Sequence, residues 1–366
     1  MSRRIVLYDV DSRIPNLALM KLSTYYKNLG FEVILSNEMK YIDADKHFAS
    51  SIFYNSRSQN KISTLKKIYG EDIEIGGSGM CLKKRLPDKV QKCFPDYNLY
   101  NHSLYALGFL TRGCNKKCSF CIVPEKEGIV KKISSSFEDF VPPEQKNIKL
   151  LDDNILAYHG VKNILKEIIQ KDYAINFSQS LDISYVNEDI SKLLLSINSM
   201  NARFTNSMIY FSCNTTKTIR DFTIRESFIQ SYKKKFGKNS ITILAMFGFN
   251  TTLQEDYERI IFIKKMGLIP FFQKYHPIIG VKPQFPANFF NMDLNDVIKL
   301  TFKSNGQNWE KYLRWINKLY FKTFGKYYFP LVKIIYKYNN KKAINKYIKN
   351  NHLLTNNLYK RYNNKN

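Results

Sequence analysis

The chain of 366 residues contains no long run of apolar residues. A membrane-spanning helix needs roughly 18 consecutive apolar residues, and no stretch approaches that length. After Arg3 and Arg4 the first apolar stretch covers only Ile5 to Tyr8, which is too short for the apolar region of a signal peptide. We therefore expect a cytoplasmic protein with no membrane partner.

Acidic residues and arginine are both scarce. The chain has 31 Asp and Glu against 57 Lys and Arg, a net charge of +26, and only 12 of the basic residues are arginine. A large positive charge suggests a nucleic acid or another anionic partner. Recognition of bases and phosphates, however, relies on the arginine fork. The lysine excess is therefore explained either by compositional drift or by a functional basic surface.

The positive charge is concentrated at the C-terminal end. Residues 291–366 hold 16 Lys and Arg against three acidic residues. An apolar stripe at helical spacing, typical of a docking helix, is formed by Trp309, Leu313, Ile316, Tyr320 and Phe324. This region is expected to be a basic helical C-terminal extension that ends in a tail.

The first 98 residues lack the GxGxxG pattern of a dinucleotide site, since their glycines gather after the last apolar segment, at Gly76, Gly77 and Gly79. Strand-like and helix-like segments nevertheless alternate here. The expected strands are Ile5–Asp9, Phe31–Leu35, Ser51–Tyr54 and Ile73–Ile75, and the expected helices run from Pro15 to Leu29 and from Ser63 to Tyr69. This order predicts an α/β, Rossmann-like domain over residues 1–98.

Residues 99–290 show six strand-like segments with helices between them. The strands are expected at Leu104–Thr111, Ile148–Leu151, Ala174–Phe177, Met208–Phe211, Ile241–Phe247 and Ile269–Phe272. The helices are expected at Val161–Gln170, Glu188–Ile197, Ile219–Phe236 and Leu253–Met266. The order predicts a partial (β/α)6 barrel of the TIM type, in which the carboxyl ends of the strands carry the chemistry.

Cysteine is also sparse, and half of it lies in one short segment. The segment holds Cys114, Cys118 and Cys121, and the remaining cysteines are Cys81, Cys93 and Cys213. A disulfide framework is not expected in a cytoplasmic chain of this length. Three thiolates at this spacing can hold one metal site with an open position. Zinc, with Cys81, Cys93 or a histidine as a further ligand, and an iron-sulfur cluster both satisfy the pattern.

The loop Gly113-Cys114-Asn-Lys-Lys-Cys118-Ser-Phe120-Cys121 resembles the cluster-binding loop of the radical S-adenosylmethionine (SAM) superfamily. It has the CxxxCxxC spacing and an aromatic residue before the third cysteine. The following Ile122-Val123-Pro124 and the Rossmann-like domain in front are similar to the methylthiotransferase and cobalamin-domain branches. Four further stretches resemble a group of bacterial and phage radical SAM proteins: Pro15–Leu22, Gly108–Cys114, Leu151–Ala157 and Phe247–Thr252. The resemblance covers roughly residues 1–290.

The resemblance implies that Cys114, Cys118 and Cys121 bind a [4Fe-4S] cluster and that SAM binds the iron they leave open. A one-electron donor such as flavodoxin or ferredoxin would reduce the cluster. Cleavage of SAM would then give a 5′-deoxyadenosyl radical that abstracts hydrogen from the substrate. Lys116 and Lys117 could offset the cluster's charge, but solvated surface lysines are the simpler interpretation.

The resemblance also suggests residues for SAM. Asp152, Asp153 and Asn154 stand where the superfamily often has a GGE-type motif for the methionyl ammonium, although this sequence is also ordinary at a helix entry. By analogy Phe120 lies beside the adenine or packs in the core. The ribose candidates are Ser212 and Asn214, and Gln179 and Asp182 are expected to face the same rim.

Two features of these branches are missing. Methylthiotransferases need three further cysteines in front for a second cluster, and only Cys81 and Cys93 are there, so methylthio transfer is not expected. Asp45 and His47 match the Asp-x-His of a cobalamin loop, but Ser50 replaces its glycine and the segment follows the second strand. A chance match explains it better, and only a binding mode without a histidine ligand stays open for cobalamin.

Two function classes follow. The first is a radical SAM enzyme whose substrate the sequence does not identify, with RNA, a peptide and a small molecule all open. The second is a non-catalytic, basic zinc- or cluster-binding module that binds nucleic acid. Metal analysis of the pure protein distinguishes the enzyme from a zinc-binding module, because a zinc-binding module contains no iron or sulfide.

Overall fold

The computed structural model describes residues 3–102, 104–247, 255, 258–259, 262–263 and 265–274. The described residues up to Ala245, together with those of Ile263–Phe271, belong to one compact unit, and the others belong to a second. The site discussed below lies in the first unit. The predicted extension over 291–366 and half of the predicted helix Leu253–Met266 lie outside the described residues.

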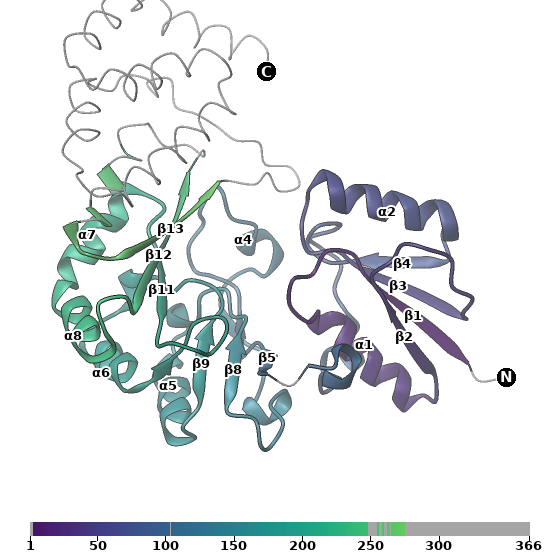
Figure 1. Ribbon diagram of the computed structural model, residues 1–366, viewed down its shortest axis with the longest axis horizontal. Coiled ribbons are helices and arrows are strands. Elements are labelled where there is room, and N and C mark those ends of the chain that lie inside the picture. Colours follow the sequence, from purple (N-terminus) through teal and green to yellow (C-terminus); the bar gives the residue numbers. More distant parts are fainter. Residues whose placement is uncertain are drawn as a thin grey trace, which may run out of the picture. The chain divides into compact units, whose positions relative to one another are not determined.

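The N-terminal part of the first unit is a parallel four-stranded sheet in the order β2-β1-β3-β4. Its strands are β1 (Arg4–Asp9), β2 (Glu32–Ser36), β3 (Lys46–Ser50) and β4 (Ile73–Gly76), and its helices are α1 (Leu17–Asn28) and α2 (Ser56–Tyr69). Alternate residues of β1 face opposite sides of the sheet. Val6 and Tyr8 belong to one buried cluster with α2, whereas Ile5 and Leu7 belong to another with α1. The sheet therefore has a helix on each face (Figure 1).

Two details of this part differ from the sequence expectation. The predicted strand Ser51–Tyr54 is wrong, because the strand ends at Ser50 and the following residues form a loop. That loop is held by Asp11, whose carboxylate accepts from the backbone N–H groups of Ile52 at 2.7 Å and Phe53 at 3.1 Å. His47 lies inside β3, where it is buried and stacked on Tyr69 with ring centroids 4.0 Å apart. The histidine of the Asp-x-His match thus packs in the core, whereas Asp45 is exposed.

The chain continues through α3 (Asp88–Gln91) and the 3-10 turn η1 (Tyr97–Tyr100) into two further parallel sheets. The first has the order β10-β9-β8-β5 and the second the order β11-β12-β13. An isolated parallel bridge between Leu181 and Phe211 joins them. The strands are β5 (Ala106–Gly108), β8 (Asn147–Leu150), β9 (Ala174–Phe177), β10 (Asn198–Ser199), β11 (Ile209–Ser212), β12 (Ile241–Phe247) and β13 (Ile269–Lys274).

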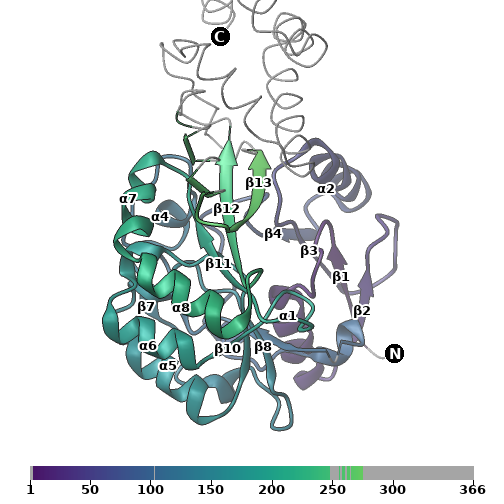
Figure 2. The same ribbon diagram turned by 60° about the vertical axis from the view of Figure 1, so that its left-hand side comes forward.

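Helices cover these sheets on one side. They are α5 (Val161–Gln170), α6 (Glu188–Ser196), α7 (Thr216–Ile224) and α8 (Glu226–Phe236). Helices α5, α6 and α8 lie next to one another beside the strands, as the two views in Figures 1 and 2 show. In α5 the buried residues Val161, Ile164, Leu165 and Ile168 form one face, which is the pattern of an amphipathic helix. No helix in the described ranges is long and apolar enough to cross a membrane.

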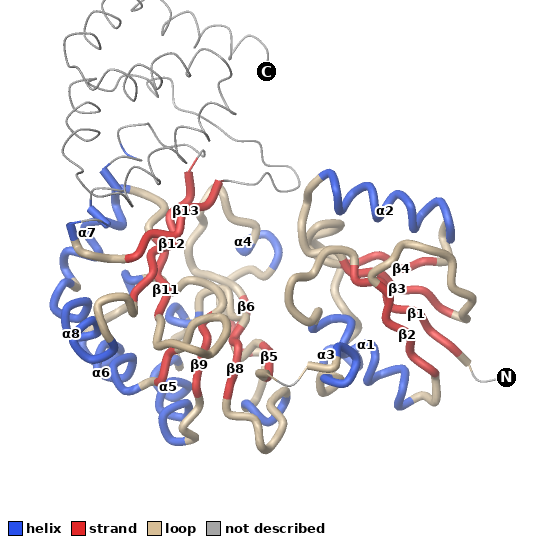
Figure 3. Tube along the Cα trace, in the orientation of Figure 1, coloured by secondary structure: helices blue, strands red, loops and turns tan. Residues whose placement is uncertain are grey.

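Two predicted elements are interrupted. The predicted strand Leu104–Thr111 ends at Gly108, and the chain then forms β6 (Thr111–Arg112), which pairs antiparallel with β7 (Lys131–Lys132). Figure 3 shows β5 and β6 as separate short strands. The predicted helix Ile219–Phe236 is divided at Arg225 into α7 and α8. Both interruptions coincide with side-chain hydrogen bonds to distant parts of the chain, made by Asp152 at the first and by Arg225 at the second.

Candidate functional site

The three clustered cysteines lie on one loop between β6 and the short helix α4 (Val123–Lys126). The loop begins at Gly113, whose φ of +99° favours glycine. A Cβ atom at this position would stand 2.6 Å from the carbonyl oxygen of Ile129. The next residue, Cys114, donates its backbone N–H to the carbonyl of Gly128 at 3.0 Å. The returning chain therefore closes the loop at its base.

Asp152, at the carboxyl end of β8, fixes the entry to this loop. Its carboxylate is buried and accepts from the backbone N–H groups of Leu110 at 3.2 Å and Thr111 at 2.5 Å, and from Thr111 Oγ1 at 2.7 Å. Because these two N–H groups bond to a side chain, they are lost to the β5 ladder, and the strand ends before them. Burial raises the pKa of Asp152 to about 6, and the donated hydrogen bonds oppose that rise.

The next two residues hold the loop as well. Asp153 accepts from the backbone N–H of Gly113 at 2.9 Å, and burial raises its pKa above the ordinary range. The side-chain amide of Asn154 donates to the Sγ of Cys114 at 3.3 Å. The Oδ1 of Asn154 is buried and has no hydrogen-bond partner among the described residues. The Asp-Asp-Asn sequence is thus more than a helix entry, since Asp153 and Asn154 bond to the cysteine loop and Asp152 bonds to the residues just before it.

The sulfur atoms also receive backbone hydrogen bonds. The N–H of Lys116 donates to the Sγ of Cys114 at 3.4 Å, and the N–H of Val123 donates to the Sγ of Cys121 at 3.5 Å. Burial raises the pKa of Cys118, and it raises that of Cys121 to about 11. The neighbouring cysteines raise both values further, which places the thiols within electrostatic reach of one another. A bound cation would reverse this balance, because metal ligation deprotonates a thiol.

The donor set fits an iron-sulfur cluster, although the side chains do not form a closed cage. Within the described ranges, no three His, Cys, Asp or Glu side chains are gathered closely enough to hold a metal ion. Coordination therefore requires the cysteine side chains to turn toward one another. The loop supplies what a cluster with one open iron uses: three sulfur ligands, and N–H donors directed at two of them.

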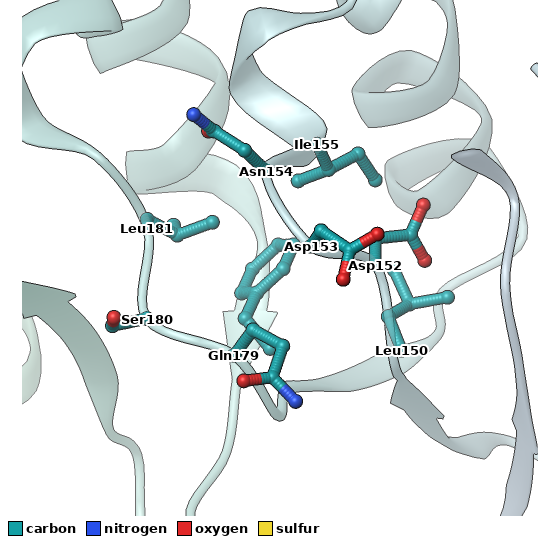
Figure 4. Close-up of a pocket in the computed structure, with 9 residues that line it drawn as sticks. Leu150, Asp152, Asp153, Asn154, Ile155, Gln179, Ser180 and Leu181 are labelled. Carbon is teal, nitrogen blue, oxygen red and sulfur yellow. The ribbon is translucent and has the colours of Figure 1, made fainter. Parts of the chain in front are cut away.

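A hollow of about 190 Å³ lies beside the loop, between the segments that follow β8 and β9. It is lined by Leu150, Asp152, Asp153, Asn154, Ile155, Phe177, Gln179, Ser180 and Leu181. Figure 4 shows the side chains of Asp153 and Gln179 in the space between these segments. Part of that space is open to solvent, and the side chains leave no room inside for a water molecule, so a ligand could enter only if the lining side chains moved apart.

The other predicted site residues are near this region but do not line the hollow. Ser212, at the end of β11, donates its backbone N–H to the carbonyl of Leu181 at 3.1 Å, and it is half-buried. Asn214 and Phe120 are also half-buried. Asp182 was expected to face the rim as a ligand residue, but its carboxylate is occupied by protein partners.

One of those partners is Lys116, which the sequence placed among solvated surface lysines. Lys116 is exposed, as expected, but its ammonium group also bonds to protein partners. Its Nζ lies 2.5 Å from Asp182 Oδ2 and 3.0 Å from Ser184 Oγ. Its burial lowers the pKa of Lys116, but the bond to Asp182 outweighs this effect and raises the value above its ordinary range. No local sequence signal shows this contact, because the partners are far apart in the chain.

Comparison with known proteins gives distant relatives and no matching family model. A tRNA-2-methylthio-N(6)-dimethylallyladenosine synthase of Buchnera aphidicola subsp. Schizaphis graminum is 26% identical over 294 residues, which are 68% of this chain and 64% of that protein. The ribosomal protein uS12 methylthiotransferase RimO of Thermodesulfovibrio yellowstonii is 22% identical over 338 residues, or 79% of this chain and 78% of that protein. The chain thus spans less than two thirds of the first relative's length.

Among solved structures, Streptococcus suis SuiB bound to precursor peptide SuiA matches with 11% identity and a TM-score of 0.35. The match covers 76% of this chain and 56% of that one, and its score is too low to carry an argument. By name the two relatives are a methylthio-nucleoside synthase and a methylthiotransferase, and the methylthiotransferase branch is one of the two that Ile122-Val123-Pro124 and the N-terminal domain resemble.

Proposed function

We propose that this protein is a radical SAM enzyme, which binds a [4Fe-4S] cluster through Cys114, Cys118 and Cys121 and abstracts a hydrogen atom from its substrate. When bound, the reduced cluster and SAM supply a 5′-deoxyadenosyl radical. Distant methylthiotransferase relatives along most of the chain support the general class. We do not propose methylthio transfer as the reaction, because it needs three further cysteines for a second cluster and residues 1–98 contain only Cys81 and Cys93.

The observation that carries this proposal is the hydrogen-bonded setting of Cys114. The loop that bears it is tied to the carboxyl end of β8 by Asp152 and Asp153, and its sulfur accepts from Asn154 and from the backbone of Lys116. Hydrogen bonds to ligand sulfurs tune the potential of an iron-sulfur cluster. A structural zinc site needs a fourth protein ligand beyond the three cysteines of the loop, whereas a cluster with one open iron needs none.

In this proposal the residues around the hollow bind one end of SAM. Asp153, Gln179 and the unpartnered Oδ1 of Asn154 are acceptors on its lining, and an ammonium group donates three hydrogen bonds. The lining side chains would have to move apart to admit the methionyl end, because they leave no room inside the hollow for a water molecule. Asp152 would act indirectly, since both its oxygens hold the loop. Phe120 beside the adenine, and Ser212 and Asn214 at the ribose, are proposed contacts of the other end.

The fold that we propose for this function has a Rossmann-like domain over 1–98, a partial (β/α)6 barrel over 99–290 and a basic helical extension over 291–366. The order β2-β1-β3-β4 is the opening order of a flavodoxin-like doubly wound sheet, which supports the first domain. Parallel strands followed by helices, with the Leu181–Phe211 bridge between their sheets, support the second.

The substrate stays open in this proposal. The first relative is named for the synthesis of a modified tRNA nucleoside and the second for a ribosomal protein. The charge of +26 favours an RNA or an RNA-bound substrate. A flavodoxin or ferredoxin would supply the electron.

A SAM cleavage assay tests the proposal. The full chain is reconstituted anaerobically with iron and sulfide and then reduced, and 5′-deoxyadenosine is quantified by chromatography. The wild type should release it, and the triple variant Cys114→Ala, Cys118→Ala, Cys121→Ala should not. A Cys81→Ala, Cys93→Ala variant is the matched control and should behave like the wild type. Equal release from the triple variant and the wild type would end the proposal.

A further inference from the structure

Lys116 links the cysteine loop to a second strand end, that of β9. It lies between Cys114 and Cys118 in the sequence, and its ammonium group bonds to both Asp182 and Ser184. The ring of Tyr185 lies beneath the same group, with its centroid 5.8 Å from Nζ. The neighbouring Lys117 is exposed and makes no such contact among the described residues.

The surface that receives Lys116 is already rigid. Asp182 caps the 3-10 turn η4 (Ile183–Tyr185), where its Oδ1 accepts from the backbone N–H of Ser184 at 3.0 Å and from Ser184 Oγ at 2.7 Å. Arg225, at the junction of α7 and α8, donates to the carbonyls of Ser184 and Val186, each at 2.6 Å. These bonds hold the turn without any contribution from Lys116. Formation of the ion pair therefore costs mainly the conformational entropy of the lysine side chain.

From this arrangement we infer that Lys116 and Asp182 are positioning residues: together they dock the cysteine loop onto η4 and hold Cys114 and Cys118 where they can bind a cluster. The inference rests on the proposed function, because it takes the loop as the cluster's ligand loop. The two side chains carry opposite charges and sum to zero, so the pair changes the net charge near the thiols very little. Its effect is therefore positional.

The burial of the pair supports this role. The side chain of Asp182 is only 14% exposed and that of Lys116 is 43% exposed, whereas an ordinary surface pair such as Lys192 with Glu188 is 70% and 82% exposed. A partly buried pair is screened less by solvent and salt. The loop is then held at both sides, by the carboxyl end of β8 at Gly113 and by that of β9 at Lys116.

Alkylation of the thiols tests the inference. The full chain, purified without oxygen, is treated with the neutral reagent N-ethylmaleimide before and after cluster reconstitution, and the rate at each cysteine is followed by peptide mass spectrometry. The variants are Lys116→Met and Asp182→Asn, of which the second keeps an oxygen that can cap η4. Lys117→Met is the matched control. Iron content after reconstitution is the second readout.

Lys116→Met and Asp182→Asn should both label Cys114 and Cys118 about three- to fivefold faster before reconstitution, as expected when one well-placed ion pair no longer opposes local opening. Both should also take up less iron. Lys117→Met should match the wild type. Cys213 is fully buried, so its slow labelling confirms that each variant is folded.

If Lys116 and Asp182 acted on the thiols only through their charges, the pattern of labelling rates would differ. Removing the lysine charge would then slow labelling by disfavouring the thiolate, and removing the aspartate charge would speed it. Opposite changes in the two variants, or no change in either, would overturn the inference. The labelling before reconstitution does not involve SAM. A wild type that fails to cleave SAM but shows this labelling pattern would reject the proposed function alone.

Discussion

The side-chain amide of Asn154 donates a hydrogen bond to the Sγ of Cys114 across 3.3 Å. This contact joins the residue that follows β8 to the first cysteine of the loop. It predicts an electrochemical effect, because a hydrogen bond to a ligand sulfur stabilises the reduced cluster.

Replacement of Asn154 by alanine should therefore lower the cluster's midpoint potential. The expected shift is about 20–60 mV, the equivalent of a net hydrogen bond of about 0.5–1.5 kcal/mol for a one-electron couple. A potentiometric titration followed by electron paramagnetic resonance measures it. Asn154→Asp should shift the potential further in the same direction, because it adds negative charge as well. Unchanged potentials in both variants would contradict the proposed contact.

Asp152 predicts a stability effect. Alanine at this position leaves two buried backbone donors and the Thr111 hydroxyl without their acceptor. Each unsatisfied buried group costs about 1–3 kcal/mol, so the free energy of unfolding should fall by about 3 kcal/mol or more. Asp153→Ala, which removes the acceptor of one donor only, should cost less. Urea denaturation checks the ranking, and equal losses would speak against the assigned bonds.

The same carboxyl group predicts a pH dependence. Burial raises the pKa of Asp152 to about 6, above its ordinary value of 3.8. Between these values the folded protein keeps a proton that the unfolded chain has lost, so the contribution of Asp152 to stability falls as the pH rises. The loss from pH 4 to pH 7 should be on the order of 2–3 kcal/mol.

The comparison variant for this prediction is Asp152→Asn, which does not titrate. The unfolding free energy of the wild type minus that of Asp152→Asn should decrease as the pH rises from 4 to 7. Urea denaturation at several pH values gives this difference directly. A difference that stays level or increases over the range would contradict the raised pKa.

Gly113 predicts that loop shape, and not only the presence of three cysteines, controls cluster binding. Alanine here would place its Cβ 2.6 Å from the carbonyl oxygen of Ile129 and would adopt an unfavourable positive φ. Gly113→Ala should therefore bind less iron than the wild type. Gly128→Ala is the matched control, since its φ is also positive but nothing lies within 4 Å of the added atom. Iron analysis after reconstitution should show a larger loss for Gly113→Ala, and equal iron contents would refute the steric argument.

Regular elements with strong hydrophobic patterns were predictable from the sequence. The bounds of β9, β12 and α5 agree with those expected from apolar runs and helical periodicity. These patterns are local, because each reports which face of one segment is buried. The cysteine loop was recognisable for the same reason, since its three ligands lie within eight residues.

Other features depend on partners that are distant in sequence. The strand expected over Leu104–Thr111 is interrupted because Asp152 takes the N–H groups of Leu110 and Thr111. Arg225 marks the break between α7 and α8 and bonds to the carbonyls of Ser184 and Val186. The bond of Lys116 to Asp182 belongs to the same class. None of these contacts leaves a periodic signal, so only the folded structure shows them.

The central claim is that Cys114, Cys118 and Cys121 hold an iron-sulfur cluster with one iron open to SAM. Electron paramagnetic resonance of the reduced, reconstituted full chain, recorded with and without SAM, tests it most directly. The account predicts a [4Fe-4S] signal that changes shape when SAM is added and that is lost in the triple cysteine variant. A protein that binds zinc without sulfide, or a cluster signal that SAM leaves unchanged, would contradict it.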